Sequence, residues 1–171
     1  AQRVSPDGGP HPSPMFLGPP LATVCWNTPY RRAFLDLVEH VVRDYEIDGI
    51  YFDSWFPHYF WPVPRTCYCP GCMEGFREAT GLEIPYRPEP EDYTERERRV
   101  IDRYHKWYRE QLIDVLVETR RIVKSYRDIP LIYNINNPQK IVREDPRVIE
   151  NMDAVLYERG QPSGPMFFVT R

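Results

Sequence analysis

Apolar residues recur every three or four positions over several stretches of the chain, which is the spacing of one face of an amphipathic helix. Thr94 and Glu97 form a capping box at the start of the longest stretch, and Gly81 suits the left-handed residue that ends another. Thr28 followed by Pro29 is a typical start for a third helix. The pattern predicts helices over residues 28–46, about 70–80, 94–123 and about 139–150.

Three short apolar runs lie between these helices. They cover residues 47–52, 131–135 and 154–157, and they are rich in aliphatic and aromatic residues. Their length favours strands over helices, and apolar residues on both faces are typical of parallel strands buried under helices. Because strands and helices alternate along the chain, the pattern predicts an α/β fold built of parallel β/α units.

The length of the chain limits which α/β fold it can complete. A (β/α)8 TIM barrel takes about 250 residues, whereas this chain has 171. We therefore predict that residues 1–171 form a single domain that is only part of such a barrel, with segments at both ends missing. A small open α/β sheet is the alternative. Residues 1–20, which are rich in Pro and Gly, predict a long loop.

Charge and composition narrow the classes of partner. The formal net charge is −3, so the chain lacks the basic field that attracts nucleic acids or anionic membranes. No apolar run reaches the roughly 20 residues of a spanning helix, and the first residues do not resemble a signal peptide. We expect a cytoplasmic protein that binds neither partner. The 19 Pro, 12 Tyr, 8 Phe and 4 Trp residues suggest rigid loops whose flat apolar rings suit a carbohydrate substrate.

Candidate chemistry lies where the predicted strands end, because the carboxyl ends of parallel strands line the site in such folds. Asp53 follows the first strand and Glu158 the third. A pair of carboxylates is what cleavage of a glycosidic bond requires, although a carboxylate after a strand is also common as a helix cap. Further candidates could stack on a sugar or bind its hydroxyl groups; they are Asn27, Trp55, His58, Tyr59, Asn134 and Asn136.

The sequence Asp-Gly-Ile-Tyr-Phe-Asp-Ser-Trp at residues 48–55 resembles the Asp-Gly-x-x-Phe-Asp strand of TIM-barrel glycoside hydrolases. It resembles especially the α-L-fucosidases and a group called hypothetical glycosyl hydrolases. In the fucosidases the Asp that ends this strand is the nucleophile, which implies that role for Asp53. The acid/base of that family has no common motif, so we assign Glu158 from its strand position. The pair predicts a retaining mechanism, with carboxyl groups about 5 to 5.5 Å apart rather than the wider spacing of inverting enzymes.

The four cysteines form a second pattern. Cys67, Cys69 and Cys72 lie within six residues, and Cys25 can supply a fourth thiolate. Four thiolates are typical of a structural zinc site and leave no open position for catalysis, and such a site favours a reducing compartment. One or two disulfides are the alternative, with three possible pairings.

The Cys-x-Cys-x-x-Cys group with a remote Cys is similar to that of the zinc-containing β-galactosidases of glycoside hydrolase family 42. In that family the carboxylate of the corresponding strand is a Glu that acts as acid/base. We favour the nucleophile role for residue 53 because it is Asp.

Two further functions remain open at this stage. One is a non-catalytic carbohydrate-binding or structural barrel in which zinc holds a loop. The other is a zinc-knuckle interaction module, which conflicts with the acidic balance and the β/α order. A homo-oligomer is also possible.

Overall fold

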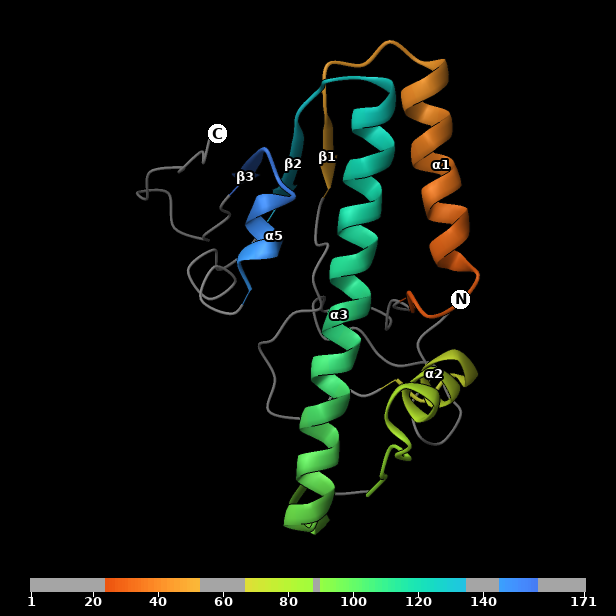
Figure 1. The fold of residues 1–171 in the computed structure, drawn as a ribbon, viewed down its shortest axis with the longest axis vertical. Coiled ribbons are helices and arrows are strands. Elements are labelled where there is room, and N and C mark those ends of the chain that lie inside the picture. The colour runs from red at the N-terminus through yellow and green to blue at the C-terminus, as the bar shows by residue number, and fades with distance from the viewer. Residues whose placement is uncertain (1–23, 53–66, 88–89, 135–144, 157–171) are drawn as a thin grey trace, which may run out of the picture. The chain divides into compact units, whose positions relative to one another are not determined.

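A computed structural model describes residues 24–52, 67–87, 90–134 and 145–156 (Figure 1). The elements, in chain order, are α1 (Tyr30–Asp44), β1 (Ile50–Phe52), α2 (Pro70–Thr80), a short 3-10 helix (Pro90–Asp92), α3 (Glu95–Tyr126), β2 (Leu131–Asn134), α5 (Pro146–Glu150) and β3 (Ala154–Leu156). At least one helix therefore separates each strand from the next, as the predicted β/α units require.

The ends of two helices form through the local interactions expected from the sequence. At the start of α3, the Thr94 backbone N–H donates to Glu97 Oε2 at 2.9 Å, and the Glu97 N–H donates to Thr94 Oγ1 at 3.3 Å. At the end of α2, Gly81 adopts φ 69° and its N–H donates to the Arg77 carbonyl at 2.7 Å. A side chain at that φ would be strained. The predicted capping box and glycine helix end are both confirmed.

The three strands form one parallel sheet in the order β1-β2-β3. Phe52 pairs with Tyr133, and Tyr133 in turn pairs with Val155. The carboxyl ends of all three strands therefore lie at the same edge of the sheet. This arrangement confirms an α/β fold with a parallel sheet, whereas the (β/α)8 barrel stays a prediction.

The structure corrects two details of the predicted elements. β1 begins at Ile50 and not at residue 47, because pairing starts where the Ile50 N–H donates to the Pro130 carbonyl at 3.0 Å. Tyr51 was expected to be buried but is 48% exposed, since β1 is an outer strand of the described sheet. Of the helix predicted over 139–150, the structure describes only α5, and residues 139–144 lie outside the described part.

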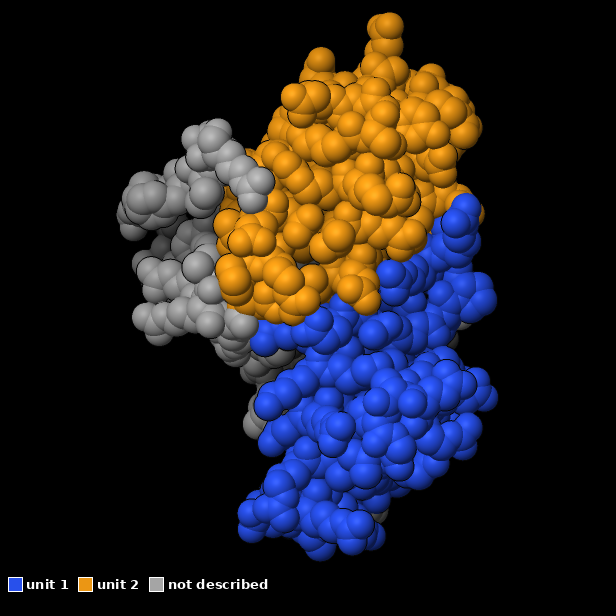
Figure 2. Space-filling model, in the orientation of Figure 1, with its two compact units in different colours: residues 1–33, 62–112 blue, residues 34–61, 113–171 orange. Residues whose placement is uncertain are grey.

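The chain divides into two compact units, each made of two segments (Figure 2). Residues 1–33 and 62–112 form unit 1, and residues 34–61 and 113–171 form unit 2. This division does not test whether residues 1–171 are one domain, which stays a prediction. Within the described residues, no helix is both long and apolar enough to cross a membrane.

Unit 2 contains the sheet and a polar contact at the amino-terminal ends of β2 and β3. Asp153 precedes β3 and accepts hydrogen bonds from the Leu131 backbone N–H at 2.9 Å and from Arg120 at 2.9 Å. Lys124 Nζ lies 3.1 Å from the same carboxylate. Burial acts to raise the pKa of Asp153, but these donors and cations outweigh it and lower that pKa below its ordinary value. The contact ties the second half of α3 to the start of β2.

Candidate functional site

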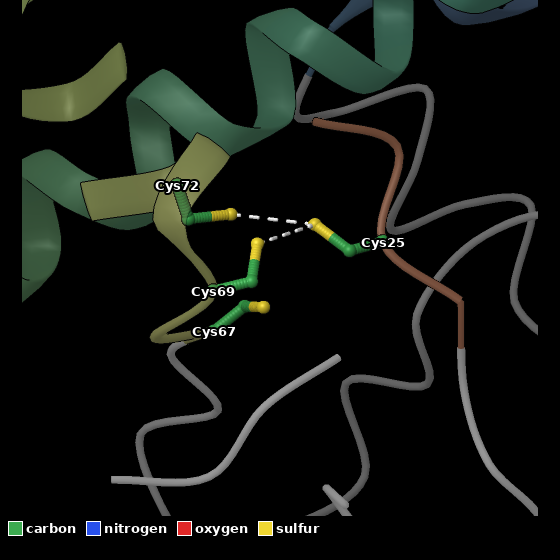
Figure 3. A group of neighbouring side chains, drawn as sticks. All are labelled: Cys25, Cys67, Cys69 and Cys72. Carbon is green, nitrogen blue, oxygen red and sulfur yellow. Dashed lines mark hydrogen bonds between the residues drawn. The ribbon is translucent and has the colours of Figure 1, made fainter. Parts of the chain in front are cut away.

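The four cysteines come together in unit 1, as the sequence predicts (Figure 3). Their sulfur atoms all lie within 4.8 Å of one another, and all four residues are buried. Cys25 Sγ lies 3.3 Å from Cys72 Sγ and 3.6 Å from Cys69 Sγ. None of these four cysteines is in a disulfide, so the disulfide alternative is not what the structure shows.

These distances fit a single metal ion. In a tetrahedral site with metal–sulfur bonds of about 2.3 Å, neighbouring sulfur atoms lie about 3.8 Å apart. The observed separations of 3.3 and 3.6 Å, with none above 4.8 Å, bracket that value. The cluster can therefore hold a metal ion through four thiolates.

The start of α2 places two of the thiols. Cys69 is the residue before the helix, and its carbonyl accepts the N–H groups of Cys72 at 2.9 Å and Met73 at 3.0 Å. Pro70 occupies the first helical position, where no backbone N–H is needed. Residues three apart in a helical turn lie on the same face, so Cys69 and Cys72 converge. Cys69 lies at the positive end of the helix dipole, which favours its thiolate form.

Two tyrosines of α3, one helical turn apart, support the cluster from another side. Tyr104 is fully buried; its hydroxyl oxygen accepts the Cys67 N–H at 3.1 Å and donates to the Cys67 carbonyl at 3.4 Å. The Tyr108 hydroxyl donates to Cys25 Sγ at 3.9 Å. The tyrosine rings are stacked with their centroids 5.8 Å apart, and Phe76 packs against Tyr104 edge-on. The thiols are thus enclosed by aromatic rings with polar tips.

Hydrogen bonding among the thiols lowers the pKa values of two of them and raises those of the other two. Hydrogen bonds with Cys25 lower the pKa values of Cys67 and Cys69, that of Cys69 to about 7. The pKa of Cys25 is raised, chiefly by its hydrogen bond with Cys67, and that of Cys72 is raised, chiefly by its hydrogen bond with Cys25. Burial raises the pKa of Tyr104, and the charge of Cys72 adds to this effect. The Tyr104 hydroxyl therefore keeps its proton, which it donates to the Cys67 carbonyl.

Asn27, predicted to bind substrate, lies beside the thiol cluster. Its side-chain Nδ2 donates a hydrogen bond to Cys72 Sγ at 3.3 Å. A contact with a sugar stays a prediction for this residue. Sequence reasoning missed this hydrogen bond and the roles of Tyr104 and Tyr108. Their spacing of four on the longest helix could have suggested that both face one site, but nothing local indicated that this site is the cysteine cluster.

The predicted catalytic residues follow two of the strands in the sequence. Phe52 is the last residue of β1, and its ring stacks on Tyr133 with centroids 4.9 Å apart. Asn134 is the last residue of β2. Asp53, the next residue after β1, lies outside the described residues, as do Trp55, His58, Tyr59, Asn136 and Glu158. Their roles stay predictions.

Comparisons with known proteins give one informative match. No family model matches the sequence, and no curated protein sequence matches it. Among solved structures, the fold is similar to that of α-L-fucosidase isoenzyme 2 from Paenibacillus thiaminolyticus, with a TM-score of 0.57 and 21% sequence identity. The match covers 90% of this chain but only 20% of the fucosidase chain. This likeness shows a shared fold with one part of a larger glycoside hydrolase.

Proposed function

We propose that this chain is part of a retaining glycoside hydrolase. The observation that carries the proposal is the parallel sheet whose strands all end at one edge, in a fold shared with a portion of an α-L-fucosidase. Asp53 and Glu158 follow the first and third of these strands in the sequence. Residues directly after parallel strands provide the active-site groups in barrels of this kind.

The chemistry assigned to the two carboxylates is a double displacement. Asp53 attacks the anomeric carbon as the leaving sugar departs, and Glu158 protonates the leaving oxygen. Glu158 then removes a proton from the water that releases the glycosyl group from Asp53, so the anomeric configuration is retained. Rings such as Trp55 and Tyr59 provide stacking surfaces for the sugar, and Asn134 and Asn136 offer amide groups for its hydroxyls.

The experiment is turnover of a panel of nitrophenyl glycosides, including the α-L-fucoside, by the longest natural chain that contains this sequence. Asp53→Asn should lose at least about 10³-fold in kcat/KM for the sugar that reacts, because the nucleophile is removed. Asp48→Asn is the matched control, since Asp48 precedes β1 and lies at the opposite end of that strand from Asp53. A variant Asp53→Asn that turns over normally would contradict the assignment.

Rescue by azide separates the two roles. In Asp53→Ala, azide should enter from the face that the nucleophile vacates and give a glycosyl azide of inverted configuration. In Glu158→Ala, azide should attack the covalent intermediate and give the retained configuration, because the nucleophile is still present. The anomeric configuration can be read by nuclear magnetic resonance. The opposite pair of outcomes would exchange the two roles.

We also propose that the four thiolates hold a structural zinc ion. A closed set of four sulfur ligands leaves no position for water or substrate, so zinc there would contribute to folding and not to the reaction. Elemental analysis should find about one zinc per chain, and Cys69→Ser should lose the metal and melt at a lower temperature. Met73→Ser, at an exposed position of the same helix, is the control. Unchanged metal content and melting temperature in Cys69→Ser would refute the site.

A second candidate function is a non-catalytic carbohydrate-binding or structural barrel. The four-cysteine cluster favours it, since it can stabilise this fold without any catalytic residue. A folded, metal-loaded protein that binds a sugar but turns over no glycoside would support this function over the first.

A further inference from the structure

We propose that Asn27 is a positioning residue of the metal centre, holding the Cys72 sulfur through its side-chain amide. This proposal rests on the metal site proposed above. The four sulfur atoms already supply a complete tetrahedral set of ligands, so Asn27 is not needed as a ligand. It acts one step further out, on the atom that would bind the metal, where hydrogen-bond donors orient ligands and adjust their charge.

The contact geometry is specific. Asn27 lies two residues after Cys25, so one short segment brings both a ligand and a hydrogen-bond donor to the cluster. Its Nδ2 lies 3.3 Å from Cys72 Sγ, a normal distance for an amide donating to sulfur. The following residue anchors the same segment, because Thr28 Oγ1 donates to the Cys25 carbonyl at 2.7 Å. The segment therefore has its own internal support.

Gly71 allows this segment to reach the start of α2. A Cβ atom added at Gly71 would lie 1.8 Å from the Asn27 carbonyl oxygen and 3.0 Å from its carbonyl carbon. Both atoms are backbone and cannot move aside as a side chain would. The glycine lies between the ligands Cys69 and Cys72. The close approach of two backbones at this point places the Asn27 amide within reach of the Cys72 sulfur.

The charge of the loaded centre explains why a neutral donor is needed. Four thiolates around a divalent ion leave a net charge of about −2 in a buried environment. An amide N–H directed at sulfur offsets part of that charge without introducing a full charge of its own. A carboxylate of the same shape would instead place a second anion beside the Cys72 sulfur. Asn27→Asp should therefore weaken metal binding more than Asn27→Ala, which removes only the hydrogen-bond donor.

The test uses Co²⁺ and Zn²⁺ with the wild-type chain and its Asn27→Ala and Asn27→Asp variants. Competition with a chromophoric chelator measures affinity. Loss of an outer hydrogen bond typically weakens metal binding 10- to 100-fold, so we expect about 10-fold for Asn27→Ala and about 100-fold for Asn27→Asp. Asn151→Asp is the matched control, because it makes the same charge change at α5, where Asn151 donates to the Arg147 carbonyl. Its affinity should equal that of the wild type.

A second readout separates positioning from simple loss of structure. An N–H donor stabilises the sulfur lone pairs, so its removal should move the thiolate-to-Co²⁺ charge-transfer band of Asn27→Ala to longer wavelength. A misfolded site would lose intensity instead of shifting. Affinities within twofold of the wild type and an unshifted band in both Asn27 variants would overturn this proposal while leaving the metal site intact. A wild-type chain that binds neither ion would overturn both.

Discussion

Replacing Tyr104 with Phe removes one buried oxygen atom and leaves the rest of the ring in place. That oxygen accepts the Cys67 backbone N–H at 3.1 Å, and both residues are fully buried. The return bond from the hydroxyl to the Cys67 carbonyl is longer, at 3.4 Å. Without the hydroxyl, a buried N–H loses its acceptor, which costs about 1 to 3 kcal/mol of unfolding free energy. We expect Tyr104→Phe to fall near the middle of that range, at about 2 kcal/mol.

Urea denaturation followed by circular dichroism, with both proteins in the same metal-loaded state, measures this difference. Tyr86→Phe is the control, because Tyr86 is 49% exposed and deletion of its hydroxyl should change stability by less than about 0.5 kcal/mol. The reasoning would fail if Tyr104→Phe destabilised the protein no more than Tyr86→Phe does. It would also fail if water replaced the missing acceptor, which would show as a change below about 0.5 kcal/mol.

Two other perturbations test the packing of α2 and the sheet anchor. Gly71→Ala should abolish metal binding, because the added Cβ would lie 1.8 Å from the Asn27 carbonyl oxygen. Gly75→Ala should keep metal binding, since its added Cβ would meet only the Trp107 ring, at 3.0 Å. Elemental analysis measures the metal content of both variants, and equal contents would contradict the predicted clash at Gly71. Because the pKa of Asp153 is lowered from its ordinary 3.8 in the folded state, its stabilising contribution is present above about pH 4 and is lost as pH falls through the lower folded pKa. Asp153→Asn should therefore be less stable at neutral pH and lose less stability on acidification, and an acid-unfolding profile parallel to that of the wild type would refute this.

The sequence predicts the features that depend on neighbouring residues. The capping box at Thr94 and Glu97 and the end of α2 at Gly81 each need only a few consecutive positions. The thiol cluster was also predictable, because three thiols within six residues leave few uses other than metal binding or disulfides. In each case the residues that form the feature lie within a single short segment. The exception is Cys25, whose place in the cluster depends on tertiary structure.

The features that escaped prediction depend on distant contacts. The hydrogen bond from Asn27 to Cys72 joins residues 45 apart, and the bond from Tyr108 to Cys25 joins residues 83 apart. Tyr104 fits the apolar periodicity of α3, so the sequence predicts a core residue at this position. The same periodicity gives no sign that the Tyr104 hydroxyl hydrogen-bonds to the Cys67 backbone. The short extent of β1 follows from its pairing with Pro130 and β2. The residues of β1 alone do not indicate where this pairing begins.

If the cluster holds the metal ion proposed above, the spacing of the thiols along the chain sets the order in which metal-assisted folding can proceed. Cys67, Cys69 and Cys72 are close enough in sequence to bind an ion while the chain is still unfolded. Cys25 must close a loop of 44 residues to reach Cys69, at an entropic cost of roughly 3 kcal/mol plus a constant. Since an ion that already binds the unfolded chain stabilises the native state less, it is the capture of Cys25 that converts metal affinity into stability. With the proposed ion bound, closure of this loop by Cys25 is therefore the step that stabilises unit 1, whereas the three neighbouring cysteines can bind the ion before the chain folds.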